Sequence, residues 1–433
     1  MEKVIIYQTL TRLWGNGKFS AWDDAAFNYL KSLSIDYIWF TGIPRHASGE
    51  PFVKGSPGSP YAVSDWYDVN PYLAENPDRR IEEFTELVAR VHKAGFKCLV
   101  DYIPNHVARN YKGELPLYPW CDGDWTDTFK VNWSDPATES EALRILQFWA
   151  SKGVDGFRCD MVELVPAEAL GRVVKSIKRE YPDMLFVAEV YGQENYTAYI
   201  ETAGFGLLYD KTGTYDILRG IQGKYRSAVE LSRNWQFLGE RQPRMLNFLE
   251  NHDEQRLASA QFAGSPGNMW AALAFGLLFN DASFMLYSGQ EAGEDASESE
   301  DGRTSIFNWC KPAALSDIWD SINGIAELPA ARKDVLDQYR ELLTLSRRMV
   351  FRSGNVWDLC YCNYTSPGFN GDEHFVFARY DADSCRLVFC NFSQRRASAL
   401  VRIPEELKKA AVINSDEAAI EAPPCGYVLT ELK

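Results

Sequence analysis

Short apolar segments alternate with longer amphipathic segments throughout the first 350 residues of this chain. A strand followed by an amphipathic helix, repeated along a chain, builds a parallel sheet covered by helices. The alternation occurs about eight times, which predicts an α/β fold, a (β/α)8 TIM barrel with insertions. The expected strands are residues 4–7, 37–40, 97–102, 156–160, 184–190, 206–209, 244–249 and 283–287. The expected helices are residues 24–33, 81–94, 137–152, 167–180, 215–233, 268–278 and 333–348.

Three stretches fall outside this alternation. Residues 41–71 form a long loop rich in Gly, Pro and Ser, and a loop of this length inside a compact domain is usually functional. Residues 104–136 are irregular and rich in Trp, Tyr and Asp, which predicts a short inserted subdomain after the third strand. Residues 353–433 are expected to form a C-terminal antiparallel β-sandwich domain that packs on the barrel, residues 1–350, as structural support. Its expected strands are residues 360–364, 373–380, 386–392, 398–403 and 427–431.

Composition limits what the protein binds and where it works. Hydrophobic residues make up 46% of the 433, enough for a large core, and the net charge is −15. An acidic surface repels nucleic acid and anionic membranes, so neither is expected as a partner, and no oligomeric state is predicted. No segment approaches the ~18 apolar residues of a membrane span, and the first apolar run is too short for a signal peptide. Nine cysteines without a Cys-x-x-Cys pair are expected to be mostly buried thiols in a reducing, cytoplasmic protein.

The stretch Gly-Phe-Arg-Cys-Asp at residues 156–160 ends the fourth expected strand. Arg158 and Asp160 are two residues apart, so their side chains point to the same side of the strand. An arginine beside a carboxylate keeps it ionised and fixes its orientation. Such a carboxylate suits the nucleophile of a covalent glycosyl transfer, although an Arg–Asp pair can also do no more than brace a sheet.

Polar clusters at three other strand ends favour the catalytic interpretation. The third strand runs into Asp101 and His106, the fifth into Glu189, and the seventh into the segment that holds His252 and Asp253. A parallel barrel gathers the carboxyl ends of its strands around one mouth, where active sites lie. Three carboxylates with cationic side chains among them suit an oxocarbenium-like transition state, because one can attack, one can move a proton and one can hold hydroxyls.

These clusters occur as D-x-x-x-N-H at residues 101–106, G-x-R-x-D at residues 156–160 and N-H-D at residues 251–253. In this order, and with Glu189 after the fifth strand, they resemble the α-amylase family of retaining glycoside hydrolases. Weaker similarity to the same family occurs at residues 42–44, 59–67, 285–291 and 301–309. The resemblance covers residues 1–350 and implies that this part is a catalytic barrel.

The resemblance implies the chemistry of three acids. Asp160 would be the nucleophile, Glu189 the general acid and then the general base, and Asp253 the residue that holds hydroxyls of the distorted sugar. Retention of configuration requires the carboxyl groups of the first two to lie about 5–5.5 Å apart. Glu189 must also be protonated at rest, so its surroundings should raise its pKa.

The resemblance also implies the substrate-binding residues. His106 and His252 would donate hydrogen bonds to the sugar, and Tyr61 would stack under its ring. Arg158 is placed in the same group, with the orientation of Asp160 as its role. Asp101 would brace the site.

The segment after the nucleophile departs from the family pattern. Many members carry Lys-His there, where the lysine meets substrate and the histidine helps to bind calcium. Leu164 cannot ligate calcium, so no cofactor and no metal site are expected. Asn105 is the one remaining candidate for a calcium ligand. Val162 and Glu163 are expected to shape the acceptor side of the cleft. Residues 130–133, Lys-Val-Asn-Trp, replace a stretch that is usually acidic.

Three functions remain open from the sequence. The first is hydrolysis of α-1,4 bonds in maltooligosaccharides or starch-derived glucans. The second is transglycosylation or hydrolysis of small α-glucosides, because water and a sugar hydroxyl compete for the same intermediate. The third is a non-catalytic relative that binds carbohydrate or a partner; such relatives typically lose a catalytic carboxylate, whereas all three are present here.

Overall fold

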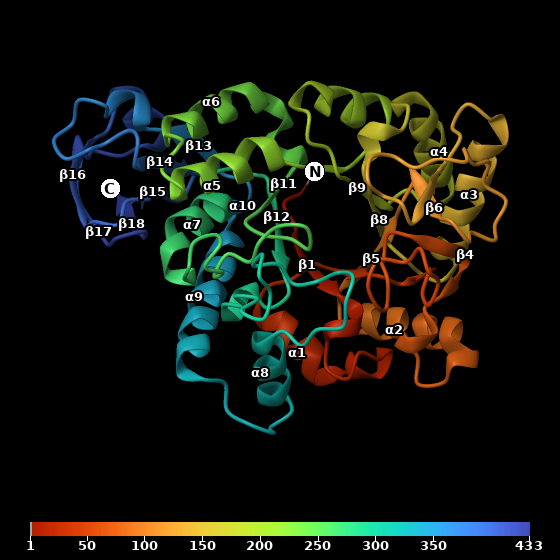
Figure 1. Cartoon of the computed structure of the whole chain (residues 1–433). Coiled ribbons are helices and arrows are strands. Elements are labelled where there is room, and N and C mark those ends of the chain that lie inside the picture. The colour runs from red at the N-terminus through yellow and green to blue at the C-terminus, as the bar shows by residue number, and fades with distance from the viewer. Residues whose placement is uncertain (1) are drawn as a thin grey trace.

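The computed structural model describes residues 2–433. Eight parallel strands form a closed barrel, in which β12 pairs with β1 to complete the ring (Figure 1). In order around the barrel they are β1 (Ile5–Leu10), β2 (Tyr37–Thr41), β5 (Lys97–Tyr102), β8 (Gly156–Cys159), β9 (Leu185–Ala188), β10 (Leu207–Tyr209), β11 (Met245–Phe248) and β12 (Ser283–Tyr287). The predicted (β/α)8 barrel is confirmed.

Helices surround the barrel (Figure 1). They are α1 (Asp24–Ser32), α2 (Arg80–Lys93), α3 (Pro136–Ser151), α4 (Ala167–Glu180), α5 (Asp216–Gln222), α6 (Val229–Leu238), α7 (Trp270–Leu278), α8 (Ala313–Ile322), α9 (Ala330–Ser346) and α10 (Met349–Arg352). The Asp23 carboxylate caps α1 by accepting from the N–H groups of Ala25 and Ala26. The single helix expected over 215–233 is two helices, because the chain turns after Gln222 and Lys224 adopts a left-handed φ of 60°.

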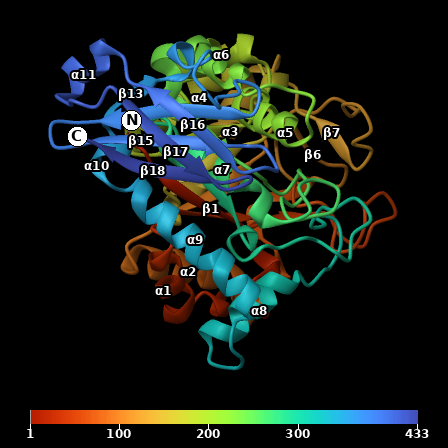
Figure 2. The ribbon, with the colours of Figure 1, turned by 90° about the vertical axis from the view of Figure 1, so that its left-hand side faces the viewer.

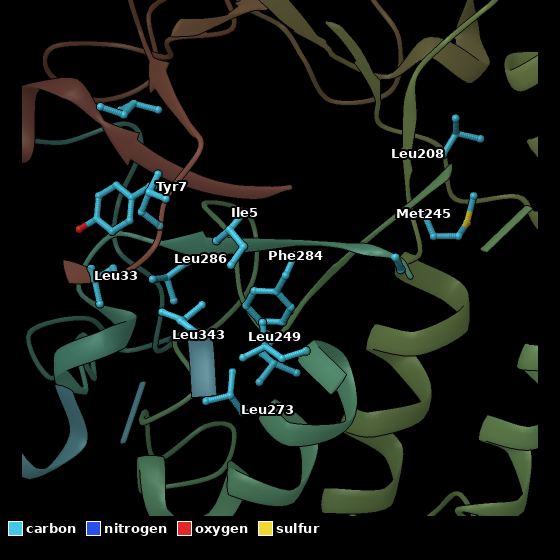
Figure 3. Close-up of a cluster of buried hydrophobic side chains, with 14 of the residues drawn as sticks. Ile5, Tyr7, Leu33, Leu208, Met245, Leu249, Leu273, Phe284, Leu286 and Leu343 are labelled. Carbon is cyan, nitrogen blue, oxygen red and sulfur yellow. The ribbon is translucent and has the colours of Figure 1, made fainter. Parts of the chain in front are cut away.

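The strands bury both of their faces, in two different layers. In β1, Ile5 and Tyr7 belong to the layer between strands and helices, whereas Ile6 lies in a second cluster with Leu99, Leu246 and Met285. This alternation is what a barrel requires, because successive side chains point outward and inward. Figure 3 shows the outer layer, where side chains of β1 and β12 meet Leu273 of α7 and Leu343 of α9.

Close packing inside the barrel explains the glycine at the start of β8. A Cβ atom at Gly156 would collide with the carbonyl oxygen of Leu185 on β9. The two strands pair directly, with Gly156 opposite Leu185 and Arg158 opposite Val187. Glycine therefore permits the register that brings the ends of β8 and β9 together.

Both long insertions contain small hairpins near the barrel mouth. The 41–71 loop includes β3 (Pro44–His46) and β4 (Val63–Val69), and the 104–136 segment includes β6 (His106–Ala108) and β7 (Thr128–Lys130). Each hairpin begins a few residues after a barrel strand, β2 or β5. The insertions therefore grow from the end of the barrel where the polar clusters lie.

The C-terminal part is built from antiparallel sheets, shown nearest the viewer in Figure 2. One sheet has the order β13 (Asn355–Asp358), β14 (His374–Tyr380), β15 (Cys385–Asn391) and β18 (Tyr427–Leu432), and the other pairs β16 (Ala397–Arg402) with β17 (Glu417–Ala422). The strand expected over 360–364 is wrong: residues 360–362 form a 3₁₀ turn, and the part includes a helix, α11 (Glu405–Ala411).

An aromatic contact joins this part to the barrel. Phe275 and Phe279, at the C-terminal end of α7, pack edge-on against Phe375 of β14. The buried Arg379 guanidinium donates to the carbonyl oxygen of Phe279 and to the Asp281 carboxylate. The two parts therefore share buried apolar and polar contacts.

Within residues 2–433, no helix is long and apolar enough to cross a membrane. All nine cysteines lie in this range and none is in a disulfide; Cys98, Cys159, Cys360, Cys385, Cys390 and Cys425 are buried.

Candidate active site

Residues that follow six barrel strands, β2, β5, β8, β9, β11 and β12, line a cavity of about 350 Å³. Asp160 directly follows β8, Glu189 directly follows β9, and Asp253 lies five residues beyond β11. All three acids line this cavity, together with Tyr61 and His106. The structure thus brings side chains from distant parts of the sequence to one rim of the barrel.

Arg158 lies beneath two of these acids and holds both. Its Nη1 donates to Asp160 Oδ1 at 2.7 Å, and its Nη2 lies 2.8 Å from Glu189 Oε2. The guanidinium is fully buried and lies within 5.5 Å of the ring centroids of Trp39, Tyr61 and Tyr209. Arg158 is absent from the lining of the cavity, so this position suits orientation of the two acids and not direct contact with a sugar.

Glu189 receives a hydrogen-bond donor on each oxygen. The N–H of Met161 donates to Oε2 at 2.9 Å, and the hydroxyl of Tyr191 donates to Oε1 at 2.7 Å. Met161 adopts a left-handed backbone conformation, with φ of 42°. A non-glycine residue in this region costs roughly 1 kcal/mol or more, and here the conformation aims a backbone N–H at the carboxyl group next to the nucleophile.

The surroundings raise the pKa values of two of the acids and lower that of the third. Burial and the charges of Asp160 and Asp253 raise the pKa of Glu189 to about 7, although Arg158 opposes the shift. Burial also raises the pKa of Asp160 against the opposing effect of Arg158. Asp253 is only partly buried, and His252 and Arg158 lower its pKa. Glu189 is therefore the acid expected to carry a proton near neutral pH.

His252 lies between a polar residue of β1 and two residues of the site. Its Nδ1 is 2.6 Å from Gln8 Nε2, and its Nε2 is 2.6 Å from the Tyr61 hydroxyl and 3.0 Å from Asp253 Oδ2. The rings of Tyr61 and His252 also stack, with centroids 5.1 Å apart. Tyr61 is therefore held rigidly at the cavity wall.

His106 and Asp101 occupy different layers of the site. His106 lines the cavity beside Trp125, with ring centroids 5.0 Å apart, and burial lowers the pKa of His106 to about 4. A neutral imidazole is suited to hydrogen bonding with sugar hydroxyls. Asp101 lies deeper, accepts from the Trp39 indole N–H at 3.1 Å and lies 3.7 Å from Arg158 Nη1. This position suits bracing.

Three loops meet above the cavity. The N–H of Trp309 donates to the carbonyl oxygen of Ser56 at 2.9 Å. The N–H of Gly58 donates to the carbonyl oxygen of Phe307 at 3.4 Å. The ammonium of Lys54 donates to the carbonyl oxygen of Asp124 at 2.8 Å. The loop after β2 is therefore tied both to the loop after β12 and to the inserted segment.

A second cavity, of about 740 Å³, adjoins the first. The two share Asp253, Ile306 and Phe307 in their linings, and His252 lines the second one. Trp309 and Arg303, both exposed, also line the second cavity. The cleft therefore extends beyond the three acids along the loop after β12.

Comparison with known proteins identifies the family. The family model for the alpha amylase catalytic domain matches residues 25–114 and 123–317. The chain belongs to the α-amylase family. The matched region contains the three acids and the residues around them.

Individual relatives are distant. Alpha-amylase 3 of Dictyoglomus thermophilum is 23% identical over 330 residues, which are 65% of this chain and 61% of that protein. The amino acid transporter heavy chain SLC3A1 of Homo sapiens is 26% identical over 216 residues, 39% of this chain and 29% of that protein. The chain thus spans less than two thirds of the length of these curated relatives. The crystal structure of an alpha-amylase from Lactobacillus plantarum has the same fold, with a TM-score of 0.74 at 19% identity over 99% of both chains.

The residues at the α-amylase family's usual calcium site do not fit a calcium ion in this chain. Both carboxylate oxygens of Asp122 lie 2.9 Å from the Lys130 ammonium, and the Asn105 amide donates to Asp122 at 2.8 Å. The other Asn105 amide atom, Oδ1, is buried without a protein partner. A cationic side chain thus already neutralises the only carboxylate bonded to Asn105, and Leu164 supplies no ligand. Among residues 2–433, no group of three or more His, Cys, Asp or Glu side chains has a metal-binding arrangement.

Neither of the two side chains expected to shape the acceptor side lines a cavity. Val162 is fully buried and lines neither cavity, so that prediction is wrong for its side chain. Glu163 accepts the backbone N–H groups of Tyr191 and Gly192 at 2.8 and 2.9 Å. It therefore fixes the loop after β9, and Tyr191 is the side chain from that loop that reaches the cavity.

Sequence reasoning missed several residues that line the first cavity. They include Lys54, Trp125, Met161, Tyr191 and Phe307. Only Tyr191 carried a readable signal, because a residue two positions after Glu189 at a strand end points to the same side as Glu189.

Proposed function

We propose that this protein is a retaining glycoside hydrolase that cleaves α-1,4-glucosidic bonds in maltooligosaccharides or starch-derived glucans. The observation that carries the proposal is the attachment of Asp160 and Glu189 to two nitrogens of one buried guanidinium, at the rim of a sugar-sized cavity. This attachment holds the two carboxyl groups next to each other, as a retaining pair requires. Membership of the α-amylase family supports the choice of α-glucosidic bonds.

In the first half-reaction, Asp160 attacks the anomeric carbon and Glu189 gives its proton to the glycosidic oxygen as the C–O bond breaks. In the second half-reaction, Glu189 takes a proton from water, and this water displaces Asp160 from the same carbon. Asp253, His252 and His106 hold the sugar through its hydroxyls. Arg158 orients both acids throughout.

A non-catalytic role is the second candidate, because a transporter heavy chain is among the relatives. The site argues against it, since all three acids are present, line one cavity and have different pKa shifts. We also propose a reducing, cytoplasmic environment, which suits nine cysteines without a disulfide.

Product analysis tests the proposed reaction directly. Maltoheptaose is expected to be cleaved into shorter maltooligosaccharides, and proton NMR should detect the α-anomer as the first product, because two inversions at one carbon restore the configuration. Maltose, pullulan and sucrose, offered in parallel, separate α-1,4 hydrolysis from action on small glucosides. Larger sugars formed at high maltose concentration would reveal transglycosylation, and a β-anomer as first product would exclude the retaining mechanism.

We further propose that catalysis needs no calcium, because Lys130 neutralises Asp122 where a metal ion would otherwise be needed. Excess EDTA is therefore expected to leave both kcat and the melting temperature unchanged. Lys130→Gln should lower the melting temperature by roughly 2–4 °C, since the partly buried carboxylate loses its partner.

Lys333→Gln is the control for this substitution. It removes the same charge from an exposed pair with Asp337 on α9 and should leave the melting temperature nearly unchanged. Inactivation of the wild-type protein by EDTA, with recovery on adding calcium, would contradict the proposal.

A further inference from the structure

Three groups lie against the carboxyl oxygens of Glu189, two through hydrogen bonds and Arg158 as an ion pair, and they differ in whether they can accept a hydrogen bond. Arg158 and the N–H of Met161, both on Oε2, are donors only. The Tyr191 hydroxyl, on Oε1, can donate or accept. When Glu189 is protonated, its proton is therefore favoured on Oε1, because a proton on Oε2 would face the N–H of Met161 and the positive charge of Arg158. Oε1 is thus the oxygen that gives the proton to the glycosidic bond.

Tyr191 is held in place from both sides of its peptide. Its N–H donates to Glu163 Oε2 at 2.8 Å, and its carbonyl oxygen accepts from the Thr212 hydroxyl at 2.6 Å. Glu163 also accepts from the Asn195 side chain at 2.6 Å, which fixes the same loop. The hydroxyl of Tyr191 is therefore presented to Glu189 by a rigid backbone.

We propose that Tyr191, held by Glu163, is a positioning residue that controls the protonation of the general acid. Its hydroxyl donates to Glu189 when that group is a carboxylate and turns to accept from Oε1 when it is a carboxylic acid. Tyr191 stays protonated in both states, because burial and the charge of Glu189 raise the pKa of its phenol far above the ordinary value. No proton leaves Tyr191 in the cycle. The inference rests on the role proposed above for Glu189.

Removal of the hydroxyl has a defined kinetic signature. In Tyr191→Phe the carboxylate of Glu189 loses a charge-assisted hydrogen bond and the carboxylic acid loses only a weaker, neutral one. The pKa of Glu189 should therefore rise, and the basic limb of the kcat/KM profile should move to higher pH by about 1 unit. The developing carboxylate in the transition state loses the same donor, so kcat on maltoheptaose should fall by roughly tenfold or more. With α-maltosyl fluoride, whose leaving group needs little protonation, the loss should stay below about threefold.

Two further variants separate positioning from general damage. Tyr67→Phe removes a similar hydrogen bond, from a tyrosine hydroxyl to Glu141 of α3 at 2.9 Å, outside both cavities. It should change neither the basic limb of the kcat/KM profile nor the ratio of the activities on maltoheptaose and α-maltosyl fluoride. Glu163→Gln should reproduce part of the Tyr191→Phe effect. The double variant should have the pH profile of Tyr191→Phe alone, because the two residues act through one hydroxyl.

Glu189→Gln, measured beside these variants, distinguishes the two levels of the proposal. If Glu189→Gln keeps activity on maltoheptaose, the acid assignment fails and the inference fails with it. If Glu189→Gln is inactive on maltoheptaose but Tyr191→Phe leaves the basic limb unmoved, or lowers activity equally on both substrates, the role of Tyr191 alone is overturned.

Discussion

Asp160→Asn is expected to lower kcat on maltoheptaose by roughly 10⁴-fold or more, while the protein stays folded. The amide keeps the shape of the carboxylate and can still accept from Arg158, so the barrel rim has no reason to rearrange. It cannot form the glycosyl ester, so the covalent route is closed. Steady-state kinetics, circular dichroism and a thermal melt measure both parts of the expectation.

Asp210→Asn is the control for this result. Asp210 is also a buried acid at a strand end, after β10, but it bonds to Thr214 and Asn234 and lines neither cavity. Turnover per folded molecule should survive in this variant even if its melting temperature falls. Near-wild-type turnover in Asp160→Asn would discard the nucleophile assignment.

Glu189→Gln is expected to lower kcat on maltoheptaose by roughly 10²–10⁴-fold and to change the pH profile. In the wild-type protein, Glu189 must be protonated, and its pKa is raised to about 7. Activity should therefore fall as the pH rises above about 7. On the acidic side, activity should fall as Asp160 is protonated, at a pH above the ordinary value for aspartate because its pKa is also raised. Glutamine does not titrate, so the basic limb should vanish.

Glu250→Gln tests whether any buried glutamate would give the same profile. Burial raises the pKa of Glu250 to about 7 as well, but this residue pairs with Arg256 and lines neither cavity. The basic limb should persist in Glu250→Gln. With α-maltosyl fluoride, whose fluoride leaves with little help from an acid, azide needs no general base and should restore turnover and yield a glycosyl azide in Glu189→Gln only. If the basic limb were lost in Glu250→Gln, the assignment of this titration to Glu189 would be wrong.

The barrel could be predicted because its signal repeats in the sequence. Segments such as 97–102 and 167–180 have the boundaries expected from apolar periodicity, since buried strands and amphipathic helices differ in period. In the C-terminal part, four expected strands agree with β14, β15, β16 and β18 to within one residue, whereas β13 and β17 were not predicted. β17 consists mostly of Glu and Ala, which are depleted in strands. Residues 360–362 alternate like a strand but turn as a 3₁₀ segment.

The candidate site could be predicted to the level of strand ends but not of individual bonds. The register of the parallel strands places the residues that follow β8, β9 and β11 at the same end of the barrel, independently of the conformation of the loops. The bond between Tyr191 and Glu189 depends on Glu163, 28 positions earlier in the chain, whose carboxylate bonds to the backbone. A bond between a side chain and a backbone group leaves no pattern of residue types. The pairing of Lys130 with Asp122 was hidden for a related reason, because it depends on how a loop folds back.

In the proposed mechanism, one shared guanidinium makes Asp160 and Glu189 respond to each other during turnover. When a sugar becomes esterified to Asp160, that side chain loses its negative charge, and the repulsion that helps to keep a proton on Glu189 disappears. Arg158 is then left to balance Glu189, so the proton affinity of Glu189 falls once its proton has gone to the leaving group. Esterification of Asp160 thus lowers the pKa of Glu189, so a single glutamate can serve as an acid before the ester forms and as a base afterwards.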